Sequence, residues 1–174
     1  AVLLDELVRR NVPIAILSNK PHDFAGVCVS EFLSAWPFDP VLGQREGIPR
    51  KPDPAGVIEV AKSLKVSPEE CVYVGDSSVD MLTAKNSGAF AVGVAWGFRP
   101  VEELVKYGAA RILDSPGFIT IQKVADDDGR AGKAARSPDE FRVGSFTGPG
   151  RAAEEDDFLG KTKLFVTAIL FKLL

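Results

Sequence analysis

The sequence predicts an α/β fold in which a parallel β-sheet is covered by helices on both faces. Up to about residue 113, short apolar runs alternate with stretches in which apolar residues recur every three or four positions. The apolar runs are continuous, which is typical of parallel strands that are buried on both faces. Because strands and helices alternate along the chain, they are expected to form β-α-β units.

The individual elements follow from these two patterns. In chain order we predict a helix over residues 1–10, a strand over 13–17, a helix over 21–34, a short strand over 40–42, a helix over 54–64, a strand over 71–74, a helix over 78–87, a strand over 90–95, a helix over 101–107 and a strand over 111–113. The third helix shows the helical spacing most clearly, with apolar residues at positions 57, 60, 61 and 64.

Three boundaries carry local signals of their own. Asp53-Pro54 supplies an N-cap residue and a proline at the first helical position. Ser67-Pro68-Glu69-Glu70 has the pattern of a capping box and stands directly before the strand over 71–74. Gly88 is expected to end the helix over 78–87.

A change of composition after residue 115 predicts where the folded domain ends. Residues 124–158 are rich in acidic residues, glycine and proline and contain few large apolar side chains, so they have little to bury. Residues 162–174 are apolar again, but Leu164–Phe171 is too short to cross a bilayer, which takes about 20 residues. We therefore divide the chain into an α/β domain over 1–123 and an irregular tail over 124–174.

Overall composition argues against several classes of protein. The 174 residues include 21 Lys and Arg against 24 Asp and Glu, a net charge of −3, so no basic surface for nucleic acid is expected. Two cysteines, Cys28 and Cys71, cannot form a disulfide framework. The sequence opens without the pattern of a signal peptide. We expect a cytoplasmic protein that binds neither nucleic acid nor membranes.

Polar residues follow the first predicted strand at Ser18 and Asn19. Open α/β sheets place their ligand sites at the carboxyl ends of the strands. A hydroxyl, an amide and the neighbouring backbone N–H groups can bind an oxyanion there. The structural alternative is that both side chains only cap the following helix.

Lys51 stands in the segment Arg50-Lys51-Pro52-Asp53-Pro54. Because Pro52 restricts the backbone of the residue before it, Lys51 is suited to direct its ammonium group at a fixed anion such as a phosphoryl group. The alternative is a surface lysine beside the start of a helix.

The segment Val72–Asp80 leads from a buried strand into Gly75-Asp76 and places a second aspartate four residues later, at Asp80. This spacing puts both carboxylates on one side of the helix turn that follows. Two carboxylates suit a hard cation such as Mg²⁺. Alternatively, Asp76 is the N-cap residue and Asp80 stabilises the helix dipole.

Taken together and in this order, the Ser-Asn strand end, the Lys-Pro and the Gly-Asp-x-x-x-Asp resemble motifs II, III and IV of the haloacid dehalogenase-like (HAD) hydrolases. The stretches SNKPHDF, FDPVLGQREGIPRKPDPAG, VYVGDSSVDMLTAKNSG and VAWGFRP are similar to the phosphoglycolate phosphatase-like branch, and the resemblance covers residues 1–115. It implies a three-layer Rossmann-like sheet and a Mg²⁺-dependent hydrolase of small phosphorylated metabolites.

The resemblance also implies roles for the individual residues. Ser18 would bind the transferring phosphoryl group with help from Asn19. Lys51 would neutralise charge on the phosphoryl group and on its carboxylate acceptor, which makes Ser18 and Lys51 the predicted catalytic residues. Asp76 would bind Mg²⁺, and Asp80 would support the metal site directly or through water.

The chain departs from the family pattern at one point. The first family motif, an apolar strand ending in Asp-x-Asp-Gly-Thr, and the helical cap after it are expected before residue 1. That strand carries the nucleophile and lies between the strands over 13–17 and 71–74. We therefore expect an N-terminally truncated, inactive phosphatase that lacks its first strand. The alternatives are a pseudoenzyme that serves as a binding module and a phosphomutase of the same superfamily.

Two segments of the tail could occupy the vacant position in the sheet. Asp126-Asp127-Asp128-Gly129 follows a fairly apolar stretch, so a circular permutation could supply Asp126 as nucleophile and Asp128 as general acid and base. Leu164–Phe171 could fill the position without any chemistry. Because neither segment matches the neighbouring apolar runs well, we expect the slot to be empty or collapsed.

Overall fold

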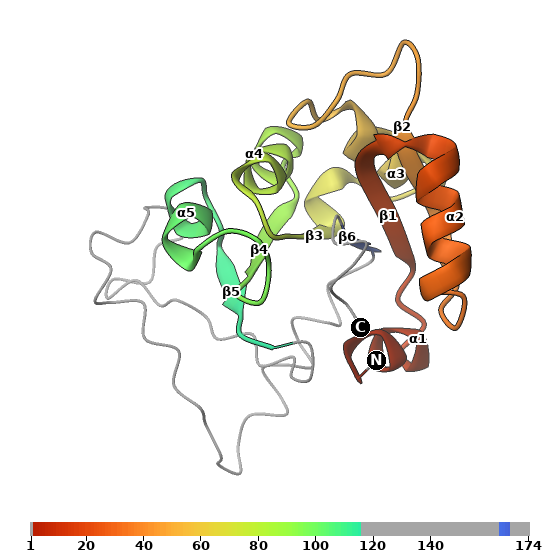
Figure 1. The fold of residues 1–174 in the computed structure, drawn as a ribbon, viewed down its shortest axis with the longest axis horizontal. Coiled ribbons are helices and arrows are strands. Elements are labelled where there is room, and N and C mark those ends of the chain that lie inside the picture. The colour runs from red at the N-terminus through yellow and green to blue at the C-terminus, as the bar shows by residue number, and fades with distance from the viewer. Residues whose placement is uncertain (1, 116–163, 168–174) are drawn as a thin grey trace.

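A wholly parallel sheet organises the computed structural model, which describes residues 2–115 and 164–167. Among these residues six strands lie in the order β2-β1-β6-β3-β4-β5 (Figure 1). Their bounds are Ile14–Pro21 (β1), Phe38–Gln44 (β2), Cys71–Gly75 (β3), Phe90–Val94 (β4), Arg111–Leu113 (β5) and Leu164–Thr167 (β6).

The helices alternate with the strands as predicted. Their bounds are Val2–Arg9 (α1), His22–Phe32 (α2), Ala55–Ser63 (α3), Ser78–Ser87 (α4) and Val101–Lys106 (α5), and a short 3₁₀ helix covers Pro68–Glu70. Every element predicted before residue 115 is present, so the α/β fold class is confirmed. β1 extends beyond the predicted residue 17 because Pro21 still pairs with Gln44 of β2.

Local sequence signals set several of the boundaries. The Ser67 backbone N–H donates to the Glu70 carboxylate at 2.9 Å, as the capping-box pattern predicts. Gly88 ends α4 with a φ of 83°, a left-handed conformation that glycine adopts without strain. α3 begins at Ala55, one residue later than predicted, and the Asp53 carboxylate accepts the Ala55 N–H at 2.9 Å.

Two apolar layers enclose the sheet, so the molecule has three layers. Successive strand residues point to opposite faces. Leu3, Leu4 and Leu7 of α1 and Cys28 of α2 pack against one face of the sheet. The other face packs against buried residues of α3, α4 and α5, which are Val57, Val60, Ala61, Met81, Ala84 and Leu104.

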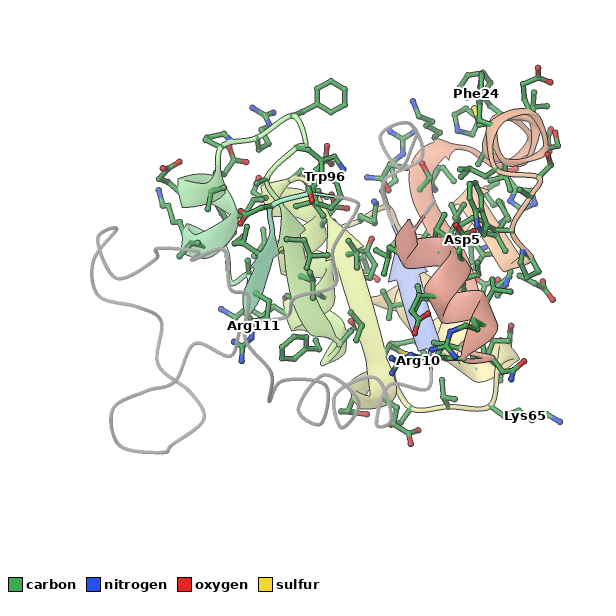
Figure 2. The ribbon with its side chains drawn as sticks, turned by 90° about the horizontal axis from the view of Figure 1, so that it is seen from below. Asp5, Arg10, Phe24, Lys65, Trp96 and Arg111 are labelled. Carbon is green, nitrogen blue, oxygen red and sulfur yellow. The ribbon has the colours of Figure 1, made fainter. Side chains whose placement is uncertain are left out.

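The expectation of an empty or collapsed slot between β1 and β3 is wrong, because β6 occupies it. Figure 2 shows this strand, in blue, between the red-orange β1 and the yellow β3. Residues 165–167 pair with Ile14–Ile16, and residues 164–167 pair with Cys71–Val74. Both neighbouring strands are buried, so an empty slot would leave their backbone N–H and C=O groups without partners. The sequence Leu-Phe-Val-Thr is rich in strand-forming residues and supplies those partners.

The remaining expectations about the tail fall outside the described residues. This holds for the boundary between residues 123 and 124 and for Asp126 and Asp128. The central position that a permuted segment would need is held by β6. No helix within the described part of the chain is long and apolar enough to span a membrane.

Candidate active site

The predicted site residues lie at the carboxyl-terminal edge of the sheet. Figure 2 places Phe24 and Trp96, which come after the ends of β1 and β4, toward one end of the sheet. It places Lys65 and Arg111, which come before or begin β3 and β5, toward the other end. Ser18 and Asn19 lie in the last part of β1, and Asp76 directly follows β3, so the parallel sheet brings all three to the same edge.

Asn19 joins the end of β1 to the loop that carries Lys51. Its Oδ1 accepts the Lys51 backbone N–H at 2.9 Å, and its Nδ2 donates to the Lys51 carbonyl oxygen at 3.2 Å. The residue that caps α2 is Pro21, and no side chain caps that helix. The interpretation of Asn19 as a helix cap is therefore wrong, and its amide fixes the backbone of Lys51 instead.

Lys51 is a buried cation with a fixed direction. Its Nζ donates to Asp80 Oδ1 at 2.7 Å and to the Leu17 carbonyl oxygen at 3.3 Å. The Lys51 and Asp80 side chains are only 9% and 5% exposed. The alternative of a surface lysine is wrong, and the ion pair brings motifs separated by 29 residues into contact.

Asp80 is held by donors on several sides. Ser77 Oγ donates to Asp80 Oδ2 at 2.6 Å, and the Tyr73 hydroxyl is 3.5 Å from Oδ1. Burial, and then the charge of Asp80, raise the pKa of Tyr73 well above its usual range, so its hydroxyl stays protonated and can donate. A Cβ at Gly75 would lie 2.2 Å from Asp80 Cβ, so only glycine allows this close approach.

Ser77 and Tyr73 also belong to the site, although neither was predicted from the sequence. Tyr73 stands in the middle of an otherwise apolar strand, and a buried tyrosine hydroxyl usually needs a hydrogen-bond partner. Ser77 caps α4 by accepting the Asp80 backbone N–H at 3.3 Å. The Ser-x-x-Asp spacing from residue 77 to residue 80 is the signal that could have identified this contact.

Asp76 lies at the same edge but has different partners. Its Oδ2 accepts the Phe98 backbone N–H at 3.0 Å. A Cβ at Gly97 would lie 2.1 Å from Asp76 Cβ, so the loop after β4 packs tightly against this aspartate. Because Ser77 is the N-cap residue of α4, the alternative role of Asp76 as the cap is wrong.

Ser18 lines a small pocket beside Lys51. Ser18 is 8% exposed, and its Oγ accepts the Lys20 backbone N–H at 3.2 Å. The pocket lies between the ends of β1 and β2, the loop after β2 and the start of α3. Arg45 also lines this pocket. Its two terminal nitrogens donate to the Glu59 carboxylate at 2.8 and 2.6 Å, and these hydrogen bonds lower the pKa of Glu59.

The donor set fits a hard cation only in part. Asp76 offers carboxylate oxygen, the ligand type that Mg²⁺ prefers. Both oxygens of Asp80 are already engaged by Lys51 and Ser77, and no group of three or more His, Cys, Asp or Glu suited to a metal occurs among the described residues. Lys51, Asp76 and Asp80 carry a formal net charge of −1, so a phosphate anion would need further positive charge here.

The sequence matches the haloacid dehalogenase-like hydrolases over residues 2–88. The chain belongs to this family. The match includes Ser18, Asn19, Lys51, Asp76 and Asp80, the residues that the structure brings to one edge of the sheet.

Individual relatives narrow the likeness within the HAD family. A phosphoglycolate phosphatase from Photorhabdus laumondii is 32% identical over 68% of this chain and 47% of its own length. A protein of solved structure from Lactobacillus delbrueckii is 42% identical in sequence, with a TM-score of 0.60 over 65% of this chain and 47% of that chain. An HAD family hydrolase from Deinococcus radiodurans, solved with bound phosphate and sodium, is 27% identical, with a TM-score of 0.59 over 64% of this chain and 52% of that chain.

These likenesses confirm the predicted HAD fold and the resemblance to the phosphoglycolate phosphatase-like branch. The chain spans less than half the length of the curated relatives it matches, from 37% to 47%.

Proposed function

We propose that this chain carries the phosphoryl-binding site of an HAD phosphatase that acts on a small phosphorylated metabolite such as phosphoglycolate. The observation that carries the proposal is the fixed ammonium group of Lys51, which is buried against Asp80 at 2.7 Å beside Ser18. A preorganised cation at a strand edge stabilises phosphoryl oxygens without rearranging when the ligand arrives.

Each residue of this site has its own role in binding the phosphoryl group. The Ser18 hydroxyl donates to one phosphoryl oxygen, and Lys51 Nζ donates to another while it keeps its contact with Asp80. Asn19 holds the Lys51 backbone and so sets the distance between the two donors. Bound Mg²⁺, held by Asp76, would supply the positive charge that the site lacks and would polarise the phosphoryl group.

We further propose that the chain with this sequence binds phosphate but does not turn over phosphomonoesters. Covalent phosphoryl transfer in this family needs a carboxylate nucleophile. β6 holds the position between β1 and β3 and ends at Thr167, and the sequence from Ala168 to Leu174 contains no Asp or Glu. The strand that fills the central position therefore brings no acceptor for the phosphoryl group.

Calorimetric titration with inorganic phosphate in the presence of Mg²⁺ tests the binding site. We expect measurable affinity that falls by about tenfold or more in Lys51→Met, since a charge-assisted hydrogen bond contributes about 1.5–3 kcal/mol. Lys62→Met, on the outer part of α3, is the matched control and should bind as the unchanged chain does. Equal phosphate affinity in Lys51→Met and Lys62→Met would contradict the assignment of Lys51.

The same preparations test turnover with p-nitrophenyl phosphate and phosphoglycolate. We expect no release of phosphate above the rate of Lys51→Met. Release that Lys51→Met abolishes would contradict the proposed inactivity. Repeating that assay with Asp126→Asn and Asp128→Asn would then show whether the acidic segment supplies the nucleophile.

Replacing Asp76 with alanine is expected to weaken Mg²⁺ binding strongly, because the Asp76 carboxylate, unlike that of Asp80, is not engaged by Lys51. Titration of both forms with Mg²⁺ measures the effect, and Asp114→Ala, beyond the end of β5, serves as a charge-matched control. Unchanged Mg²⁺ affinity in Asp76→Ala would refute the role of Asp76.

A further inference from the structure

Residues 45–54, between β2 and α3, form the Lys51 loop, which is attached to α4 at two points. One is the ion pair between Lys51 Nζ and Asp80, which lies in the first turn of that helix. The other is a hydrogen bond at 2.9 Å from Asn86 Nδ2, near the end of the helix, to the Pro52 carbonyl oxygen. α4 therefore contacts both the ammonium group of Lys51 and the backbone of the residue that follows it.

We propose that Asn86 is a positioning residue that holds Lys51 in the phosphoryl-binding site. The inference rests on the proposed function and gives a role to a residue to which the family resemblance assigned none. Asn86 acts through the backbone of Pro52 and touches no ligand itself. Together, Asn19 and Asn86 hold the residue pair Lys51-Pro52 from two sides.

The sheet topology explains why such a tether is needed. Asn19 belongs to β1 and Asn86 to the helix after β3, and β6 separates these two strands. The Lys51 loop therefore crosses from one half of the sheet to the other. Asn19 fixes the loop to the first half, and Asn86 fixes it to the second half, which also carries Asp80.

The position of Asn86 favours a local role over a role in global stability. The residue is exposed, and asparagine is a weaker helix former than alanine. An exposed hydrogen bond adds little to the free energy of unfolding. The hydrogen bond from Asn86 can still restrict the loop. The bond from the Asp53 N–H to the Arg50 carbonyl oxygen, at 3.0 Å, closes a turn within the loop and does not attach the loop to another element.

Asn86→Ala tests the inference, with Ser87→Ala as the matched control on the same helix turn. The first measurement is amide hydrogen exchange by NMR without ligand. The Lys51 N–H donates to Asn19 Oδ1, so its exchange rate reports how firmly the loop is held. We expect this rate to rise by about threefold or more in Asn86→Ala and to stay unchanged in Ser87→Ala. Asn86→Asp, which cannot donate to the carbonyl oxygen, should behave like Asn86→Ala.

The second measurement is the affinity of each variant for inorganic phosphate with Mg²⁺. We expect a loss of about threefold in Asn86→Ala at an unchanged midpoint of thermal unfolding. Unchanged exchange at Lys51 would overturn the inference, and so would faster exchange spread over the whole sheet, because that marks a global loss of stability. If the unchanged chain binds no phosphate while exchange at Lys51 rises in Asn86→Ala, the proposed function fails and the role of Asn86 in holding the loop stands.

Discussion

Replacing Asp80 with asparagine is expected to lower the free energy of unfolding by about 3–5 kcal/mol. The substitution keeps the shape of the side chain but leaves the Lys51 ammonium group buried without its counter-charge. The two side chains are only 9% and 5% exposed, so water makes up for the lost counter-charge only in small part. Urea unfolding followed by circular dichroism measures the change. We also expect phosphate affinity to fall, because Asp80 fixes the direction of Lys51.

A double-mutant cycle separates the ion pair from other effects of the substitution. Lys51→Met removes the cation, and the pair Lys51→Met with Asp80→Asn removes both charges. We expect the double variant to be clearly more stable than the sum of the two single losses predicts, since no buried charge is left without a partner. Additive losses would show that Lys51 and Asp80 do not depend on one another.

Replacing Val166 with proline is expected to destabilise the fold by about 2–4 kcal/mol. Val166 is paired with Ala15 of β1 and with Tyr73 of β3, so it stands inside the sheet. Proline has no backbone N–H and cannot donate in the ladder, and it leaves a buried carbonyl oxygen without a partner. The midpoint and slope of urea unfolding measure the loss.

Val166→Thr is the matched control, because threonine has a similar shape and keeps the backbone N–H. We expect Val166→Thr to lose clearly less stability than Val166→Pro. Equal stability of Val166→Pro and the unchanged chain would mean that β6 does not contribute to the sheet in solution.

Much of the fold could be predicted because its signals are local. Gly88 ends α4, and the Ser67–Glu70 capping box precedes β3, as the residues at these positions require. Continuous apolar runs predicted where the strands lie. A parallel sheet then requires Ser18 and Asp76, at the carboxyl ends of their strands, to lie at one edge. These features depend on neighbours within a few residues or on the period of the pattern.

The position of β6 could not be predicted in this way. Leu164–Thr167 has only four residues, and it pairs with strands about 90 to 150 positions earlier in the chain. Its place depends on the cost of leaving two buried strands unpaired, and that cost is a property of the whole sheet. The apolar pattern of this segment matches those of its neighbours poorly, but this mismatch costs less than leaving the two buried strands unpaired.

The network around Lys51 was also only partly predictable. The motifs predicted that Lys51, Asp76 and Asp80 serve one site, but not that Asp80 would be engaged by Lys51 and Ser77. Tyr73 contacts Asp80 from the interior of β3, and Asn86 contacts the Pro52 backbone from the far end of α4. Such contacts depend on side-chain directions that the spacing of residues does not reveal.

Because the proposed lack of turnover depends on which strand lies between β1 and β3, NMR measurement of the contacts of Val166 decides it. Neighbouring strands lie about 4.8 Å apart, close enough for nuclear Overhauser effects between backbone protons. We expect Val166 to show such effects both to residues around Ala15 of β1 and to residues around Tyr73 of β3. Direct effects between Ala15 and Tyr73, with none to Val166, would contradict the central place of β6 and the explanation of inactivity built on it.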